Sequence, residues 1–196
     1  MNKYSCKNHS VGRDEMKKVW LVQMLLIVLL FGCQHVQNDL LDTSQLEKVE
    51  PTGNLTEEQL KTIPVTYNAT SLEEGLDALP FKVKIPKDLP FDAVPLKISS
   101  IEDFHQDGKN IRASFITTAR DHSEEIILLI GVENFQAEQS GSMEEVQLAK
   151  DVVAKFTGNT LFFEKDGINY TVSYINKIIS SEQHKNDMIK IANQML

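Results

Sequence analysis

Cysteine is scarce in this chain, which has two, Cys6 and Cys33, among 196 residues. Two are too few for a disulfide framework or for a structural zinc site built on cysteine. The sequence also lacks a His-Glu-x-x-His motif and a glycine-rich phosphate-binding loop. The motifs therefore predict no metal, no cofactor and no catalytic residue, and the chain is not expected to be an enzyme.

Positive charge is also in short supply. The chain has 20 Lys and Arg against 28 Asp and Glu, which gives a net charge of −8 at pH 7. Proteins bind nucleic acid through a basic surface, and anionic lipid attracts basic segments. We therefore expect no nucleic-acid partner, and no domain that lies flat on anionic lipid.

A membrane-spanning hydrophobic run is missing too. The apolar stretch from Val19 to Phe31, interrupted by Gln23, is shorter than the about 20 residues that cross a bilayer as a helix. Lys17 and Lys18 precede it, an arrangement typical of a secretory signal. Either translation starts at Met16, just before the lysines, or residues 1–15 are a cytoplasmic lead.

The apolar run ends in Leu30-Phe31-Gly32-Cys33, which resembles the lipobox of bacterial lipoproteins. The resemblance implies that signal peptidase II cuts between Gly32 and Cys33, and that Cys33 carries an S-diacylglycerol and an N-acyl group. Phe31 is bulkier than the residue usual at its position. Each buried methylene contributes about 0.8 kcal/mol, so two or three chains would anchor the protein at the outer face of the cell membrane. The alternative is an idle cysteine after an uncleaved helix.

Composition changes again after Cys33. Residues 34–70 are rich in polar side chains and interrupted by Pro51 and Pro64, which predicts a flexible tether. Thr56 can cap a short helix, and a segment that folds on binding a partner is the alternative. The predicted organisation is a lead and signal peptide at 1–32, a lipidated cysteine and tether at 33–70, and an extracytoplasmic domain at 71–196.

The predicted domain reads as α+β. Ser71 can cap a short helix that ends before Pro80, and Ser180 or Ser181 can cap a last helix with Met188 and Ile191 on one face. Between them, period-two patterns and turn residues predict antiparallel strands. Their ranges are 81–85, 96–101, 111–117, 125–132, 146–148, 152–156, 160–164 and 168–174.

Two segments resemble a domain-of-unknown-function family of Gram-positive bacteria, found in lipoproteins and in the outer parts of anti-sigma proteins. One runs from Ser71 through Phe81-Lys82-Val83-Lys84-Ile85-Pro86 to Pro90, and the other runs from Leu161 through Asp166-Gly167 to Val172. The resemblance implies a curved antiparallel sheet with a helix packed at each end of the domain. Phe91 and Asp92 stand where the family often has glycine, and the family pattern supplies no catalytic residue.

Two clusters of polar residues could in principle bind a metal ion or form a catalytic site. Glu102, Asp103, His105 and Asp107 could bind a cation, but they lack the spacing of a calcium loop, and a solvated hairpin end is the preferred interpretation. His122 lies among Asp121, Ser123, Glu124 and Glu125. Catalytic triads are assembled from separate elements, so neighbours in sequence are not expected to form one.

Seven aromatic residues lie mostly on predicted strands, where we expect them to fill the core. They are Phe81, Phe115, Phe156, Phe162, Phe163, Tyr170 and Tyr174. Two functions follow. The first is a non-enzymatic binding or sensing module whose partner is an unknown protein or envelope component. The second is a half-barrel carrier whose aromatics line a cavity for a lipid or other hydrophobic ligand.

Overall fold

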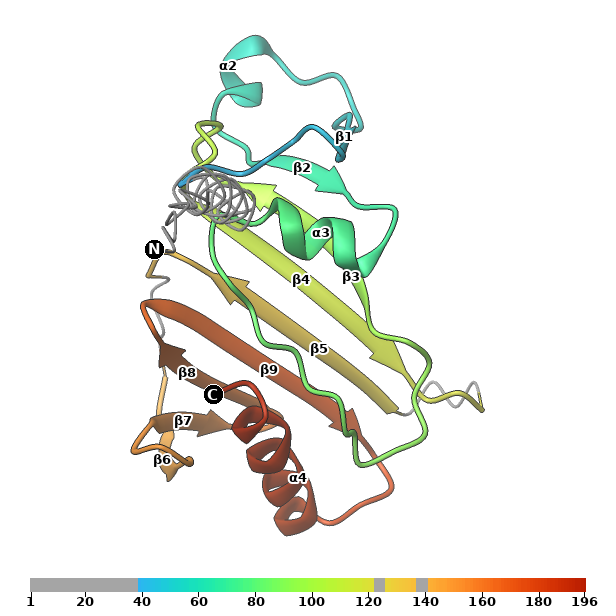
Figure 1. Ribbon diagram of the computed structural model, residues 1–196, viewed down its shortest axis with the longest axis vertical. Coiled ribbons are helices and arrows are strands. Elements are labelled where there is room, and N and C mark those ends of the chain that lie inside the picture. The colour runs from blue at the N-terminus through green and yellow to red at the C-terminus, as the bar shows by residue number, and fades with distance from the viewer. Residues whose placement is uncertain (1–38, 122–125, 137–140) are drawn as a thin grey trace, which may run out of the picture. The chain divides into compact units, whose positions relative to one another are not determined.

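The computed structural model describes residues 39–121, 126–136 and 141–196 (Figure 1). All described residues belong to one compact unit, Gln37–Leu196, which contacts separate from Met1–Val36. The predicted signal peptide and lipobox, including Leu30, Phe31, Gly32 and Cys33, lie outside the described residues.

One antiparallel sheet dominates the described part of the chain, where it has nine strands in the order β1-β2-β3-β4-β5-β9-β8-β7-β6. The strands are β1 (Glu47–Val49), β2 (Val65–Asn68), β3 (Lys97–Asp103), β4 (Ile111–Thr118), β5 (Ile126–Glu133), β6 (Glu144–Gln147), β7 (Val153–Thr157), β8 (Thr160–Lys165) and β9 (Ile168–Asn176). The order describes two meanders, β1–β5 and β6–β9, joined where β5 pairs with β9. Strand β5, predicted at 125–132, is the central strand of the nine described.

Alternation along the strands decides which face is buried. In β4, Ile111, Ala113, Phe115 and Thr117 are buried while the residues between them are half-buried. The same pattern holds in β9. The β8–β9 turn also follows the sequence prediction, because Asp166 and Gly167 both have positive φ, 53° and 78°, as a two-residue hairpin turn requires.

The buried face of the sheet is covered by two helices and by the segment that follows the first of them. Helix α3 (Leu72–Ala78), residues 79–96 and helix α4 (Ser181–Asn193) lie on the same side of the sheet (Figure 1). Ser71 and Ser180 cap these helices by accepting from Glu74 N and Gln183 N, as predicted. Helix α3 approaches β3 closely at Gly75, where a Cβ atom would lie 2.1 Å from Ile98 Cδ1.

The predicted strand at Phe81–Ile85 was wrong. Its side chains do alternate, with Phe81 buried and Lys82 exposed, but the segment pairs with no strand of the described sheet. Residues 79–96, which we call the crossing segment, follow α3 in the chain and run over the covered face of the sheet before β3 begins (Figure 1). Four prolines in this segment lack the N–H that a ladder needs, so an extended crossing suits it better than a place in the sheet.

The predicted tether also needs correction where the structure describes it. Residues 39–70 contribute β1, β2 and the short helix α2 (Glu57–Leu60), and β2 pairs with β3. Leu41 is buried in the core, and Thr56 caps α2 with the predicted capping box. The fold therefore starts well before Ser71. The fold class is mostly β, with α4 the one described helix longer than ten residues.

Candidate functional site

The sheet has an uncovered face, opposite the helices. It is formed by the alternate strand residues that point away from the core, among them Arg112, Ser114, Ile116, Leu129, Gly131, Glu133, Lys155, Phe162, Glu164, Asn169 and Thr171. Most are half-buried by their neighbours, while Leu129 is 39% exposed. Such a face is where an open antiparallel sheet meets solvent or a partner.

Arg112 lies on β4 in this face, and its guanidinium group contacts carboxylates and aromatic rings. Its Nη2 and Nε atoms lie 2.7 and 2.8 Å from Glu133 Oε2, and its Nη1 lies 4.0 Å from Glu102 Oε2. The guanidinium also lies over the ring of Phe104, 4.8 Å from the centroid, and 5.8 Å from that of Phe135. This arrangement fixes the cation in place, because carboxylate and ring together satisfy it.

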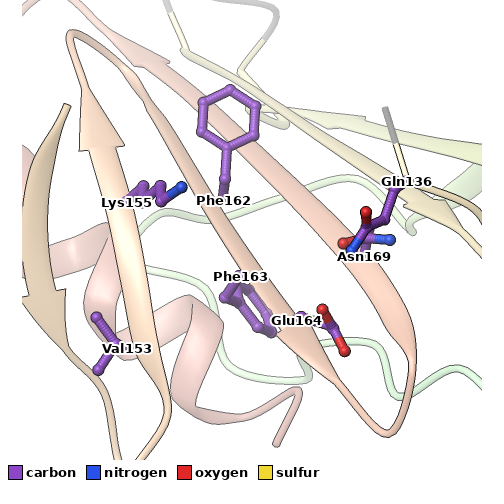
Figure 2. A pocket seen from close by; sticks show the side chains of 7 residues that line it. All are labelled: Gln136, Val153, Lys155, Phe162, Phe163, Glu164 and Asn169. Carbon is purple, nitrogen blue, oxygen red and sulfur yellow. The ribbon is translucent and has the colours of Figure 1, made fainter. Parts of the chain in front are cut away.

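A hollow of about 320 Å³ opens near the other end of the uncovered face, over β7, β8 and β9. Its lining residues are Gln136, Val153, Lys155, Phe162, Phe163, Glu164 and Asn169. Figure 2 shows Gln136, Asn169 and Glu164 together on one side and Val153 and Lys155 on the other, with Phe162 between them. The volume lies at the lower end of the range typical of small-molecule sites.

Strand register explains this placement. Lys155 pairs with Phe162 across β7 and β8, and Glu164 pairs with Asn169 across β8 and β9. Asn169 is further fixed because its Nδ2 donates to Phe135 O at 2.9 Å. The hollow was not predicted from the sequence. The signal for it in the sequence is Phe162, an aromatic residue next to the buried Leu161 and therefore on the opposite face of β8 from Leu161.

A second hollow, of about 550 Å³, lies between the crossing segment and the end of α4. Gln194 fixes its wall: Oε1 accepts from Lys87 N and Asp88 N at 3.0 and 2.9 Å, and Nε2 donates to Asp88 O at 2.7 Å. Lys84 Nζ donates to Leu196 O at 2.6 Å. These contacts attach the crossing segment to α4, so we assign this hollow to packing.

The cluster of Glu102, Asp103, His105 and Asp107 lies at the end of the β3–β4 hairpin, which was the preferred interpretation of the sequence. Asp103 Oδ2 accepts from Gly108 N at 2.7 Å, Asp107 Oδ1 accepts from Lys109 N at 3.0 Å, and His105 bonds to Asn110. Within the described ranges, no three His, Cys, Asp or Glu residues gather to hold a metal ion. The cluster around His122, which was not expected to form a catalytic triad, falls on residues 122–125, outside the described part.

Five of the seven predicted core aromatics are buried: Phe81, Phe115, Phe163, Tyr170 and Tyr174. Phe163 stacks on Tyr170 with centroids 4.8 Å apart, and Tyr174 lies between Phe91 and His184 at 5.8 and 5.2 Å. Burial raises the pKa of Tyr170 and Tyr174 above the ordinary 10.0 of a phenol. Phe156 is half-buried and lies 5.7 Å below Lys185 Nζ, so Phe162 is the predicted core aromatic that faces outward.

None of the helices in the described ranges is long and apolar enough to cross a membrane. Comparison of the chain with protein-family models, with curated proteins and with solved structures finds no match. The resemblances to the lipobox and to the Gram-positive domain family therefore stay predictions.

Proposed function

We propose that this protein is a lipoprotein, anchored through Cys33 at the outer face of the cell membrane, whose domain is a non-enzymatic binding module. The observation that carries the anchor is the order of Lys17, Lys18, the apolar run Val19–Phe31 and the sequence Leu30-Phe31-Gly32-Cys33. Two or three acyl chains at one cysteine hold a protein to a bilayer stably.

The binding role is supported by the uncovered face. An open antiparallel sheet with a hollow over β7–β9 offers a partner a preformed surface, and surfaces of this kind suit binding without chemistry. The carboxylates of Asp103 and Asp107 hold turn backbone instead of aiming at a cavity. The partner is a small molecule, protein or envelope component that meets this face.

The alternative is a carrier of half-barrel type for a lipid or hydrophobic ligand. It requires a curved sheet whose aromatics line a cavity. Phe115, Phe163, Tyr170 and Tyr174 are instead buried among core side chains, which favours the binding module. A fluorescent fatty-acid dye tests this alternative. Binding of the dye to the purified protein at micromolar concentration, and its displacement by a fatty acid, would favour the carrier.

The anchor is tested in a bacterial host fed radiolabelled palmitate. We expect the wild-type chain to take up label, to shorten to the size set by cleavage before Cys33, and to sediment with membranes. Cys33→Ser removes the sulfur at the lipobox position, which takes the diacylglycerol in this proposal, so it should abolish both label and shortening.

Cys6→Ser is the matched control, because it removes the other cysteine and should leave label and cleavage unchanged. A Cys33→Ser chain that is labelled and shortened like the wild type would overturn the proposed anchor.

A further inference from the structure

The hollow over β7–β9 differs from the rest of the uncovered face in its charges. Arg112, on the same face, is held by two carboxylates, whereas Lys155 and Glu164 form no ion pair with any described residue. Both line the hollow and both are exposed. One cation and one anion, neither paired within the described part of the chain, therefore face the same small space.

The two charges stand at opposite sides of that space. On one side, Glu164 offers a carboxylate and Asn169 offers Oδ1 as an acceptor, because Asn169 Nδ2 is already bonded to Phe135 O (Figure 2). A carboxylate and an amide oxygen together suit an ammonium group. On the other side, Lys155 Nζ suits a carboxylate.

The surface between the charges is apolar. Phe162 lies between the two sides in Figure 2, and Val153, on the β7 side of the hollow, is 52% exposed, the second-largest exposed fraction among the large hydrophobic residues described. A half-buried ring and an exposed valine in one hollow favour contact with an apolar side chain of a ligand. The hollow thus offers a cation, an apolar floor and an anion in sequence.

Register places the two charged residues at neighbouring positions of the β7–β8 pair, which favours a short ligand. Lys155 is opposite Phe162, so Glu164 stands diagonally from Lys155 across the β7–β8 pair. Diagonal positions in an antiparallel pair are roughly 7–8 Å apart. An extended dipeptide spans about 7 Å between its ends, and the flexible side chains of Lys155 and Glu164 can reach outward by the further length that a contact at each end needs.

We propose that this hollow binds a short peptide with free termini, of dipeptide length and with an apolar side chain. Its carboxylate lies at Lys155, its ammonium group at Glu164 and Asn169, and its side chain on Phe162 and Val153. The proposal rests on the proposed binding function and names the ligand class of that function. It does not depend on the lipid at Cys33.

Calorimetric titration of the full-length protein in detergent micelles tests it, with the dipeptide Gly-Phe as probe. We expect Gly-Phe to bind, and N-acetyl-Gly-Phe and Gly-Phe amide to bind about three- to tenfold more weakly, because each lacks one charge. Lys155→Gln should remove the penalty for the amide and keep the penalty for the acetyl group. Glu164→Gln should do the reverse.

Lys97→Gln is the matched control, an exposed lysine of β3 that does not line the hollow. It should leave all three affinities unchanged. The proposal is overturned if Gly-Phe does not bind, or if Lys155→Gln and Glu164→Gln leave both penalties as they are in the wild type. A chain that is labelled at Cys33 but does not bind Gly-Phe would overturn this ligand and leave the anchor standing.

Discussion

Tyr174 shows how a single residue of β9 connects three parts of the fold. Its ring stacks between Phe91 of the crossing segment and His184 of α4, with interplanar angles of 10° on each side. Asn176 Nδ2 donates to its hydroxyl oxygen at 2.8 Å, and His184 Nε2 donates to its carbonyl oxygen. Alternation in the sequence was enough to place Tyr174 in the core. It could not reveal the stack, because Phe91 and His184 lie on segments far apart in the chain.

The buried phenols predict alkaline sensitivity. Burial raises the pKa of Tyr67, Tyr170 and Tyr174 above 10.0, the ordinary value. The folded state therefore holds these protons more tightly than the unfolded state. The stability that this difference contributes is complete below pH 10 and is lost as pH rises through the folded pKa values. We expect the free energy of unfolding in urea to be steady from pH 8 to 9 and to fall above pH 10.

Tyr174→Phe separates this effect from general alkaline damage. The variant keeps the stacked ring and removes one ionisable phenol, so its free energy of unfolding should fall less steeply above pH 10 than that of the wild type. Identical slopes for the two proteins would contradict the assignment to Tyr174.

At the scale of elements, the sequence predicted paired strands well and the crossing segment badly. Strand β9 shows both period-two alternation and a hairpin turn, and these two signals agree on a partner strand. Phe81–Ile85 shows the alternation alone. A segment that lies across a sheet also turns every second side chain toward the core, so alternation predicts burial and cannot by itself predict pairing.

Helix α4 packs apolar side chains against the sheet from outside it. Ile191 is fully buried in it, beside Met188 and Ala192. Ile191→Ala should lower the free energy of unfolding by about 2–5 kcal/mol, because it removes buried methylenes and leaves a cavity. Asn186→Ala, at an exposed position of the same helix, should not lower it by more than about 0.5 kcal/mol. Urea unfolding monitored by circular dichroism measures both, and equal losses would show that α4 is not packed as described.

At the scale of the whole molecule, the extent of the fold was the main error of sequence reasoning. Residues 39–70 have the polar composition of a spacer, yet β2 hydrogen-bonds to β3 and extends the sheet. Backbone pairing does not require an apolar sequence, and β1 is exposed at all three positions. Composition is therefore a poor guide to whether an edge strand is ordered. The hollow was missed for a related reason, since strand register decides which polar side chains meet.

Two adjacent leucines test where the fold begins. Leu41 is 8% exposed and belongs to the core, whereas Leu40 is 45% exposed. Leu41→Ala should therefore lower the free energy of unfolding by about 2–3 kcal/mol, and Leu40→Ala by less than about 0.5 kcal/mol. If residues 34–70 were a flexible tether, neither substitution would change the urea midpoint.

The junction of β5 with β9 has a consequence for how the chain matures. During synthesis, β1 to β5 can pair with one another as soon as they emerge. The second partner of β5 is β9, which emerges only after β6, β7 and β8. Until then β5 presents a row of unsatisfied amides and carbonyls that any foreign extended segment could capture. Correct folding therefore requires that β9 pairs with β5 before a strand of another chain does.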